Sequence, residues 1–591
     1  MKYSEYLVRR LQNLGYTHCF FLAGGNSMHL LDAARLHMTC TPFVHEVSAV
    51  IACEYFNALR GPGLGRAFVL VTAGPGLTNT VTGIAGAYLE SREVLIVGGQ
   101  VKTTDLSRGV VRQRGIQEID GCSIVRPVTK RSLRVEQPLL GRALDEVVAD
   151  SQSGRPGPVF LEICLDTQAV TVDEDPNSPV HLHIQPRSGT DEIGAHVRKI
   201  TSVLLRSTRP VLLVGGGLDR SESPSLLDFL HLNPLPVMTT WNGADRLPSD
   251  HPNYCGRPNT WGQRWSNIVL QQADVVLALG TRLGLQQTGF NWQEFAPRAT
   301  VIQVDIDQSE LDKGHPRVDF PVCADANELL RKLSNVALPD FTSWNEFALT
   351  VRDELPLSEH VNKVSAPYIN SFDFVEYLSR VSDDTDIVIP CSSGGAFTVM
   401  MQAFSLKGKQ RMLTNKGLAS MGYGLAGAIG ASLANVDKRT ILVEGDGGFC
   451  QNLQELATVA RHSLPIKMFI FSNNGYASIR MTQKNYFGGD YLGCDISTGL
   501  GFPDWRLLAS AFGIEYLEIT PDLWQDSNLQ ASWTRRSPSL YIVPIDPEQT
   551  YFPKISSRVT ANGSMESAPL HLMTPELPVA VAEKVFRFLS D

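Results

Sequence analysis

The sequence predicts an α/β protein with three doubly wound domains whose sheets are mostly parallel. Short, continuous apolar segments recur along the chain, stretches with helical spacing separate them, and Gly-rich or polar turns follow several of them. Apolar strands without alternating polar residues are typical of parallel sheets that are covered by helices on both faces. A length of 591 residues is enough for three or four domains of ordinary size.

The first predicted domain covers residues 1–168. Apolar strands are expected at 18–22, 67–71 and 94–97, with helical segments between them. A polar, Pro-bearing stretch at 170–189 follows and predicts a linker.

The second predicted domain covers residues 190–338, with buried strands at 209–214, 275–280 and 301–305. Pro339, Pro356 and Pro367 then indicate a second linker. The third predicted domain covers 368–546. A Pro- and Ser-rich tail, 547–591, completes the chain, and we expect one last helix near 579–589.

Composition excludes several classes of function. Hydrophobic residues make up 43% of the chain and charged residues 19%, which is typical of a globular protein with a large core. The net charge of −9 argues against nucleic-acid binding. The chain has no run of 18 apolar residues, so we expect no membrane span, and charges interrupt the N-terminus where a signal peptide is apolar. Ten scattered cysteines without a Cys-x-x-Cys pair indicate reduced thiols, and we expect a cytoplasmic location.

A Gly-rich turn in the third block carries the clearest chemical signal. Asp446 lies among Gly445, Gly447 and Gly448, and Asn473 follows Asp446 by 27 residues. A β-α-β unit needs about thirty residues to return to the same sheet edge, so the two polar side chains are expected to meet there. They are suited to a small hard cation, while the glycines let backbone approach a diphosphate. The alternative is an ordinary Gly-rich turn followed by a polar turn.

This spacing resembles the signature of thiamine-diphosphate enzymes, and the three-block order is similar to the acetohydroxyacid (acetolactate) synthase-like family over nearly the whole chain. The resemblance implies thiamine diphosphate and Mg²⁺ as cofactors. It implies that Asp446, the Asn473 side chain and the Gly475 carbonyl bind the metal. Further cofactor contacts are implied for Tyr476 and Ala477.

In the family a Glu at the place of Glu46 touches a ring nitrogen of the cofactor's pyrimidine. A carboxyl is needed there because it shares a proton with that nitrogen, which is general acid–base work. A solvated residue at a helix start is the alternative. The run from Thr72 to Asn79, with Pro75, matches the family turn that lies near the pyrimidine.

Met421 precedes Asp446 by 25 residues, as does the family's apolar wedge beneath the cofactor. A core methionine that fills space is the alternative. The resemblance assigns the Ala419 backbone to the cofactor's amine. It assigns a second diphosphate turn to Ser393, Gly394 and Gly395, although the family's usual Gln-His is missing there.

Gly24, Gly25 and Gln117 resemble family residues that face the reacting carbons, with Gln117 as a candidate hydrogen-bond donor to a carbonyl. For Gln117, simple surface polarity is the alternative. Gly25, Gln117, Glu46 and Met421 are the residues we expect nearest the chemistry, and Gly24 is expected to contact the cofactor.

Two absences favour carbon–carbon ligation over aldehyde release. Simple decarboxylases carry a His pair in the loop that corresponds to 105–118, and an acid shortly after the second metal-binding turn. Here residues 106–115 contain no His, and Ile479 holds the later position. The segments 476–483 and 502–505 also look like a sub-branch whose members transfer two-carbon units onto ketosugars, and 480–500 is expected to form a lid.

The resemblance predicts a homo-oligomer with active sites between subunits, with Glu46 from one chain and Asp446, Asn473 and Met421 from its partner. The central block either binds FAD without using its redox chemistry or does not bind it. Its candidate contacts are 215–217, 280–282, Asp305 and Asp325, but the loop 283–287 departs from the family pattern. The expected activity is decarboxylation of a 2-keto acid, most plausibly pyruvate, with transfer to an acceptor carbonyl. A non-ligating decarboxylase, another lyase or acetyltransferase, and a catalytically dead homologue stay open.

Overall fold

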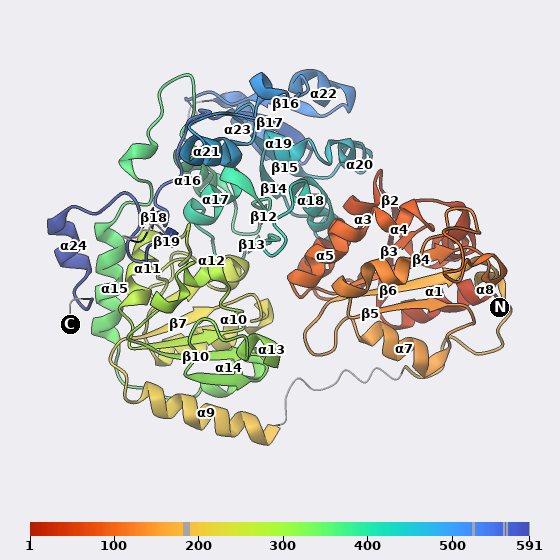
Figure 1. Ribbon diagram of the computed structural model, residues 1–591, viewed down its shortest axis with the longest axis horizontal. Helices are drawn as coiled ribbons and strands as arrows, with labels where there is room; N and C mark the ends of the chain where they lie inside the picture. Colours follow the sequence, from red (N-terminus) through yellow and green to blue (C-terminus); the bar gives the residue numbers. More distant parts are fainter. Residues whose placement is uncertain (181–189, 523–525, 560–561, 563–564, 590–591) are drawn as a thin grey trace. The chain divides into compact units, whose positions relative to one another are not determined.

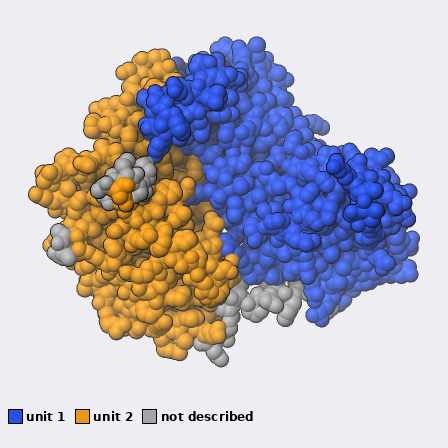
Figure 2. All heavy atoms as spheres, in the orientation of Figure 1, with its two compact units in different colours: residues 1–185, 385–394, 413–544 blue, residues 186–384, 395–412, 545–591 orange. Residues whose placement is uncertain are grey.

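The computed structural model describes residues 1–180, 190–522, 526–559, 562 and 565–589. The chain forms two compact units, which Figure 2 distinguishes by colour. Unit 1 consists of Met1–Gln185, Thr385–Gly394 and Leu413–Pro544, and unit 2 consists of Pro186–Asp384, Gly395–Met412 and Ile545–Asp591. Part of the first predicted linker, 181–189, lies outside the described residues.

Unit 1 contains a parallel sheet in the order β2-β1-β3-β4-β6-β5. Its strands are β1 (Tyr16–Phe21), β2 (Thr39–Pro42), β3 (Arg66–Val71), β4 (Val94–Gln100), β5 (Arg131–Val135) and β6 (Pro158–Cys164). Neighbouring strand residues point to opposite cores: Phe20 and Val69 belong to one cluster, and Cys19 and Leu70 to the other. The sheet is therefore covered on both faces, as the apolar strands predicted.

Different helices cover the two faces (Figure 1). One face packs on α3 (Glu46–Leu59) and α5 (Val81–Leu89), and the other on α1 (Tyr3–Asn13), α2 (Met28–His37) and α7 (Gly141–Ala149). The short helices α4 (Pro75–Thr78), α6 (Gly121–Val125) and α8 (Leu165–Ala169) lie in connections.

A second parallel sheet of unit 1 runs β12-β14-β15-β17-β16. Its strands are β12 (Ile387–Ile389), β14 (Thr440–Gly445), β15 (Ile466–Ser472), β16 (Glu515–Glu518) and β17 (Ser539–Pro544). The helices that connect them are α18 (Tyr423–Ala434), α19 (Asp446–Phe449), α20 (Leu456–Arg461), α21 (Ala477–Tyr486), α22 (Trp505–Ala511) and α23 (Ser527–Thr534). Helix α18 packs on α3, so the two sheets of unit 1 share one apolar core.

Unit 2 contains the sheet β11-β10-β9-β7-β8, also parallel. Its strands are β7 (Pro210–Val214), β8 (Val237–Thr239), β9 (Val275–Leu279), β10 (Thr300–Asp305) and β11 (Phe320–Cys323). The sequence pattern did not predict β8 and β11, because both are short edge strands and β11 contains a proline. The larger helices are α9 (Thr190–Leu204), α10 (Ser223–Leu232), α11 (Arg264–Gln271), α14 (Ala326–Leu333), α16 (Ser371–Val381) and α17 (Gly394–Ala403).

The segment predicted as the second linker is not a plain linker. It contains α15 (Thr342–Glu354), and Trp344, Ala348 and Val351 of this helix are buried in a core of unit 2. The three prolines lie outside the helix and hid its apolar spacing. The tail forms an antiparallel pair, β18 (Ser557–Val559) with β19 (Met565–Ser567), and a last helix, α24 (Val579–Val585). No helix in the described part of the chain combines the length and apolar character needed to cross a membrane.

Candidate active site

The turns that carry Asp446 and Asn473 are in direct contact at the carboxyl ends of β14 and β15. These strands are neighbours in parallel register, with Gly445 opposite Phe471. The Asp446 carboxylate accepts hydrogen bonds from the backbone N–H of Gly447 at 2.7 Å and of Asn473 at 3.0 Å. The β-α-β spacing thus brings an acidic and an amide side chain to one sheet edge.

This pair of turns fits a bound cation. The amide oxygen of Asn473 is buried and has no hydrogen-bond partner among the described residues. Burial raises the pKa of Asp446 to about 6, although the N–H groups of Gly447 and Asn473 oppose the shift. A divalent cation would supply a partner to the orphaned oxygen and a counter-charge to the carboxylate. The described residues contain no group of three or more His, Cys, Asp or Glu suited to a metal, so a site here depends on amide and backbone oxygens.

The three glycines around Asp446 have different roles. A Cβ on Gly447 would lie 2.2 Å from the ring of Tyr476, and a Cβ on Gly448 would lie 3.0 Å from Glu444. A Cβ on Gly445 would meet nothing within 4 Å. Gly445 thus borders open space where a diphosphate could approach, whereas packing requires Gly447.

The segment after Asn473 is held by residues that sequence analysis did not select. Arg480, on α21, donates to the Asn473 carbonyl at 3.0 Å, and its guanidinium lies 3.8 Å from Asp495. A Cβ on Gly475 would lie 2.1 Å from the Cys494 carbonyl, and the N–H of Tyr476 donates to that carbonyl at 2.7 Å. Ala477 begins α21, so Tyr476 and Ala477 form the corner between turn and helix.

Glu46 is the first residue of α3, and β2 already ends at Pro42. Its side chain is 9% exposed and accepts a hydrogen bond from the Asn79 amide at 3.0 Å. Asn79 directly follows α4, whose first residue is Pro75. The predicted run from Thr72 to Asn79 therefore orients the carboxyl of Glu46.

A pocket of about 350 Å³ lies between the first and third blocks within unit 1. Asn79 and Met421 both line it, and the remaining lining residues are His45, Val47, Ile51, Thr78, Thr82, Ser420, Gln451, Asn452 and Gln454. Ala419, two residues before Met421, has a φ of +55°, which a non-glycine residue adopts only where its surroundings enforce it. The structure thus brings Met421 and Asn79, the hydrogen-bond partner of Glu46, to one cavity.

Glu455 connects the two blocks beside this pocket, and sequence analysis missed it. Its buried carboxylate accepts from the backbone N–H of Val44 at 3.1 Å, from that of His45 at 3.0 Å, and from the Thr458 hydroxyl at 2.6 Å. Burial raises its pKa, and these hydrogen bonds oppose the shift. No local signal could identify this connection, because Val44 and His45 lie about 410 residues earlier in the chain.

Gly24, Gly25 and Gln117 form a second group, near the start of the turn that runs from Thr72 to Asn79. A Cβ on Gly24 would lie 2.3 Å from Thr72, while Gly25 borders open space. The Gln117 carbonyl packs so closely on Gly74 that a Cβ there would lie 2.4 Å away. These residues do not line the 350 Å³ pocket, but they adjoin the turn that holds Pro75 and Asn79.

The predicted second diphosphate turn and the predicted FAD contacts do not line this pocket. Ser393 follows β12, Gly394 begins α17 with a φ of +82°, and a Cβ on Gly395 would lie 2.5 Å from the Tyr551 ring. In unit 2, a Cβ on Gly215 would lie 2.2 Å from the Gly280 carbonyl. The carboxylates of Asp305 and Asp325 accept from the backbone N–H groups of Asp307 and Asn327, so they shape a turn and a helix cap.

Comparison with known proteins agrees with this architecture. Three family models match: the N-terminal TPP binding domain of thiamine pyrophosphate enzymes at residues 1–124, the central domain at 197–333 and the C-terminal TPP binding domain at 393–542. A probable acetolactate synthase large subunit of Methanocaldococcus jannaschii is 30% identical over 93% of each chain. The chain belongs to the acetolactate synthase-like family of thiamine-diphosphate enzymes.

Two further members of this family are similarly related. The acetolactate synthase isozyme 2 large subunit of Escherichia coli is 29% identical, over 94% of this chain and 97% of its own length. The chloroplastic acetolactate synthase 1 of Zea mays is 30% identical, over 88% of this chain and 81% of its own length. The likeness therefore extends through both units, and the predicted family resemblance is confirmed.

Proposed function

We propose that this chain is a thiamine-diphosphate- and Mg²⁺-dependent carboligase. It decarboxylates a 2-keto acid, with pyruvate as the first candidate, and transfers the two-carbon unit to an acceptor carbonyl. The observation that carries the proposal is the cavity lined by both Met421 and Asn79, with Asn79 bonded to Glu46. The names of the relatives, which are acetolactate synthases, support the ligating class.

The residues present fit both cofactors. Asp446, the unpartnered amide oxygen of Asn473 and the Gly475 carbonyl would hold Mg²⁺, and the open space at Gly445 would admit the diphosphate. When bound, thiamine diphosphate supplies a carbon nucleophile for a keto carbonyl and takes up the electron pair that carbon dioxide leaves behind.

The chain's own residues supply proton transfer and shape. The Glu46 carboxyl would exchange a proton with the ring nitrogen of a bound pyrimidine, and the Asn79 amide fixes the direction in which that carboxyl points. Met421 offers an apolar side chain to the cavity that Asn79 also lines, where it would restrict the conformations open to a bound cofactor.

Ligation in place of aldehyde release depends on which proton donors are present. Residues 106–115 contain no His, and Ile479 is a half-exposed apolar residue where decarboxylases carry an acid. Without those donors, protonation of the two-carbon unit is slower and an acceptor carbonyl competes better for it.

Binding of FAD in unit 2 stays a prediction, because the close contact of Gly215 with Gly280 serves packing of the two turns whether or not a nucleotide is present. The purified protein tests it directly: a yellow solution with a flavin spectrum supports binding, and a colourless one contradicts it. The cytoplasmic location also stays a prediction.

Product analysis tests the proposed activity. Purified protein with thiamine diphosphate and MgCl₂ receives pyruvate together with a panel of 2-keto acids, aldehydes and ketosugars, and mass spectrometry identifies the products. We expect carbon dioxide release and products that equal one acceptor plus one two-carbon unit, with loss of both on chelation by EDTA and recovery with added Mg²⁺. Acetaldehyde alone would indicate a non-ligating decarboxylase, acetyl phosphate or a similar product another transferase, and no turnover a catalytically dead homologue.

A further inference from the structure

Glu118, the residue after Gln117, organises the loop that precedes Gln117. Glu118 is buried, and its carboxylate accepts hydrogen bonds from the backbone N–H of Ser107, of Arg114 at 2.8 Å and of Gly115 at 3.1 Å. Burial acts to raise the pKa of Glu118, but these N–H groups outweigh it and lower the pKa to about 2. Glu118 is therefore a fixed anion that closes the loop 107–118 upon itself.

Gln117 has a backbone conformation that needs such support. Its φ is +63°, a left-handed conformation that is sterically unfavourable for a non-glycine residue. This conformation places its carbonyl against Gly74, at the start of the turn that leads through Pro75 to Asn79. The amide of Asn26 also reaches this loop and donates to the Ile116 carbonyl at 3.4 Å.

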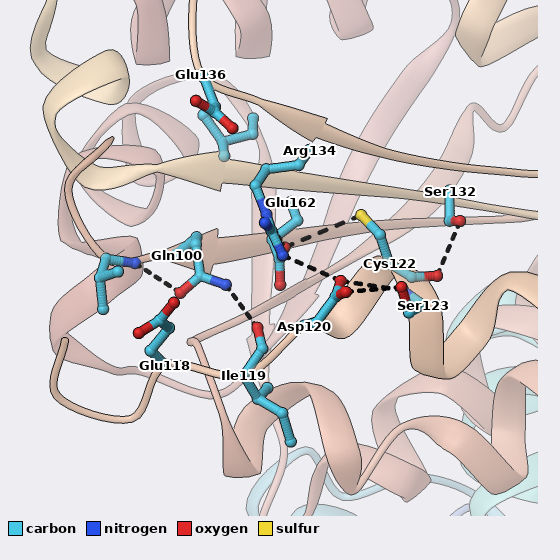
Figure 3. Close-up of polar contacts among 12 residues, drawn as sticks. Gln100, Glu118, Ile119, Asp120, Cys122, Ser123, Ser132, Arg134, Glu136 and Glu162 are labelled. Atoms are coloured by element: carbon cyan, nitrogen blue, oxygen red, sulfur yellow. Dashed lines mark hydrogen bonds and ion pairs between the residues drawn. The ribbon is translucent and has the colours of Figure 1, made fainter. Parts of the chain in front are cut away.

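The chain beyond Glu118 is anchored separately, as Figure 3 shows. The Gln100 amide donates to the Ile119 carbonyl at 2.9 Å, and Asp120 caps α6 by accepting from Ser123. Arg134 connects Asp120 with the buried Glu162, at 3.1 and 2.9 Å. With Ile119 fixed on one side and the loop closed on the other, little freedom remains at Gln117.

We propose that Glu118 is a positioning residue that holds Gln117 in its left-handed conformation beside the turn of Pro75 and Asn79. The carboxylate of Glu118 is bonded to the backbone of its own loop, so it acts through Gln117 and not on a substrate. This inference rests on the proposed function, since Gln117 is expected to face the reacting carbons. Loss of Glu118 should slow the chemical step and leave cofactor binding intact.

The test combines an activity-independent measurement with kinetics on the full chain. In Glu118→Gln, hydrogen–deuterium exchange should become faster in peptides that cover 107–117 and stay unchanged in β4 and α6. The kcat for ligated product from pyruvate should fall about tenfold, because small misplacements of reacting groups cost rate steeply. The Kd of thiamine diphosphate, followed by tryptophan fluorescence with Mg²⁺ present, should change less than twofold.

A double-mutant cycle isolates the route through Gln117. If Glu118 acts through that residue, Glu118→Gln should lower kcat less than twofold in a Gln117→Ala background. Asp526→Asn is the matched control, because Asp526 also accepts two backbone N–H bonds but caps α23. It should leave kcat and exchange in 107–117 unchanged.

Several outcomes overturn the proposal. Unchanged exchange in 107–117 contradicts the role of Glu118 in the loop, and an equal loss of kcat in both backgrounds contradicts action through Gln117. If Glu118→Gln does not fold, Glu118→Asp, which keeps the charge but shortens the reach, takes its place. If neither variant folds, Glu118 is required for the folding of unit 1 as a whole, and the proposal is wrong. If the wild type does not turn over pyruvate, the proposed function fails while the exchange result still decides the structural claim.

Discussion

The buried polar side chains of the candidate site are of two kinds. Some have hydrogen-bond partners within the protein, and others have an oxygen that is left for a ligand. Glu455 has protein partners for its buried carboxylate, and its role is to hold Val44 and His45 in place. The amide oxygen of Asn473 is equally buried and has none among the described residues. Because an unsatisfied buried polar atom costs roughly 1–3 kcal/mol, the second kind marks where a cation would bind.

The substitution Glu46→Gln separates the proton-transfer role of this side chain from its size and its hydrogen bond with Asn79. Glutamine keeps the size of the side chain and can still accept from Asn79, but it cannot exchange a proton with the cofactor. We expect carbon dioxide release from pyruvate to fall by about 10²-fold or more, with an unchanged thermal unfolding temperature. Glu146→Gln, an exposed residue of α7, is the control and should keep full activity. Near-normal turnover by Glu46→Gln would refute the mechanism.

Among the elements, the contact of α3 with α18 determines how the first and third blocks of unit 1 meet. Helix α3 carries Glu46 at its start and the buried Glu54 two turns later, and Glu54 pairs with Arg92 and accepts from Asn415 at 3.1 Å. A Cβ on Gly430 of α18 would lie 2.0 Å from the Ala52 carbonyl. Backbone therefore packs on backbone there, and neither helix can accommodate an added methyl group.

Gly430→Ala tests this contact. The added methyl collides with main chain, which cannot rotate away as a side chain would, so we expect a loss of about 1–3 kcal/mol in the free energy of unfolding. Gly501→Ala is the control, since a Cβ there meets nothing within 4 Å, and it should change stability by less than about 0.5 kcal/mol. Urea unfolding measures both, and equal stabilities would show that the two helices are not in tight contact.

The tail that precedes α24 carries a pH-dependent element. Burial lowers the pKa of His571 to about 4, and its ring packs edge-on against Phe586. The His571 ring is therefore protonated below about pH 6.5 in the unfolded chain, but only below about pH 4 in the folded chain. Stability is fully present above pH 6.5 and declines as the pH falls through this window, by on the order of 3 kcal/mol at most.

Urea unfolding at several pH values between 7 and 4 checks this expectation. His571→Phe keeps an aromatic ring beside Phe586 and removes the titrating group, so its stability should fall less steeply than that of the wild type. Parallel pH profiles for the two proteins would contradict a neutral, partly buried His571.

For the whole molecule, the sequence predicts that two chains build each site. Within unit 1, one chain already brings Asn79 and Met421 to the same cavity. The prediction of sites between subunits is tested by mixing two inactive variants, Glu46→Gln and Asp446→Ala, after co-refolding or co-expression.

If each site uses Glu46 of one chain and Asp446 of its partner, random pairing restores one intact site in half of the dimers. Activity should then return to about a quarter of the wild-type value. If both residues come from one chain, the mixture stays inactive. Light scattering on the same samples shows whether the variants still associate, which separates a failed assembly from a site within one chain.

Sequence patterns predicted this protein best where the relevant residues are close in the chain. The apolar strands and the 27-residue interval place Asp446 beside Asn473, because a β-α-β unit has a limited length. Prediction was wrong where local signals conflict: three prolines concealed α15, and the shortness of β8 and β11 left them without a visible pattern.

By itself the sequence determined that the chain forms parallel α/β sheets and that an acid and an amide meet at one sheet edge, because periodicity and short-range spacing are local properties. Only the tertiary structure decided which side chains approach from far along the chain. Three such contacts depend on how packed helices and sheets enclose a common core: the hydrogen bonds of Glu455 with Val44 and His45, the ion pair of Arg92 with Glu54, and the packing of Gly430 against Ala52. Such contacts follow from the filling of space in three dimensions, which no interval along the chain encodes.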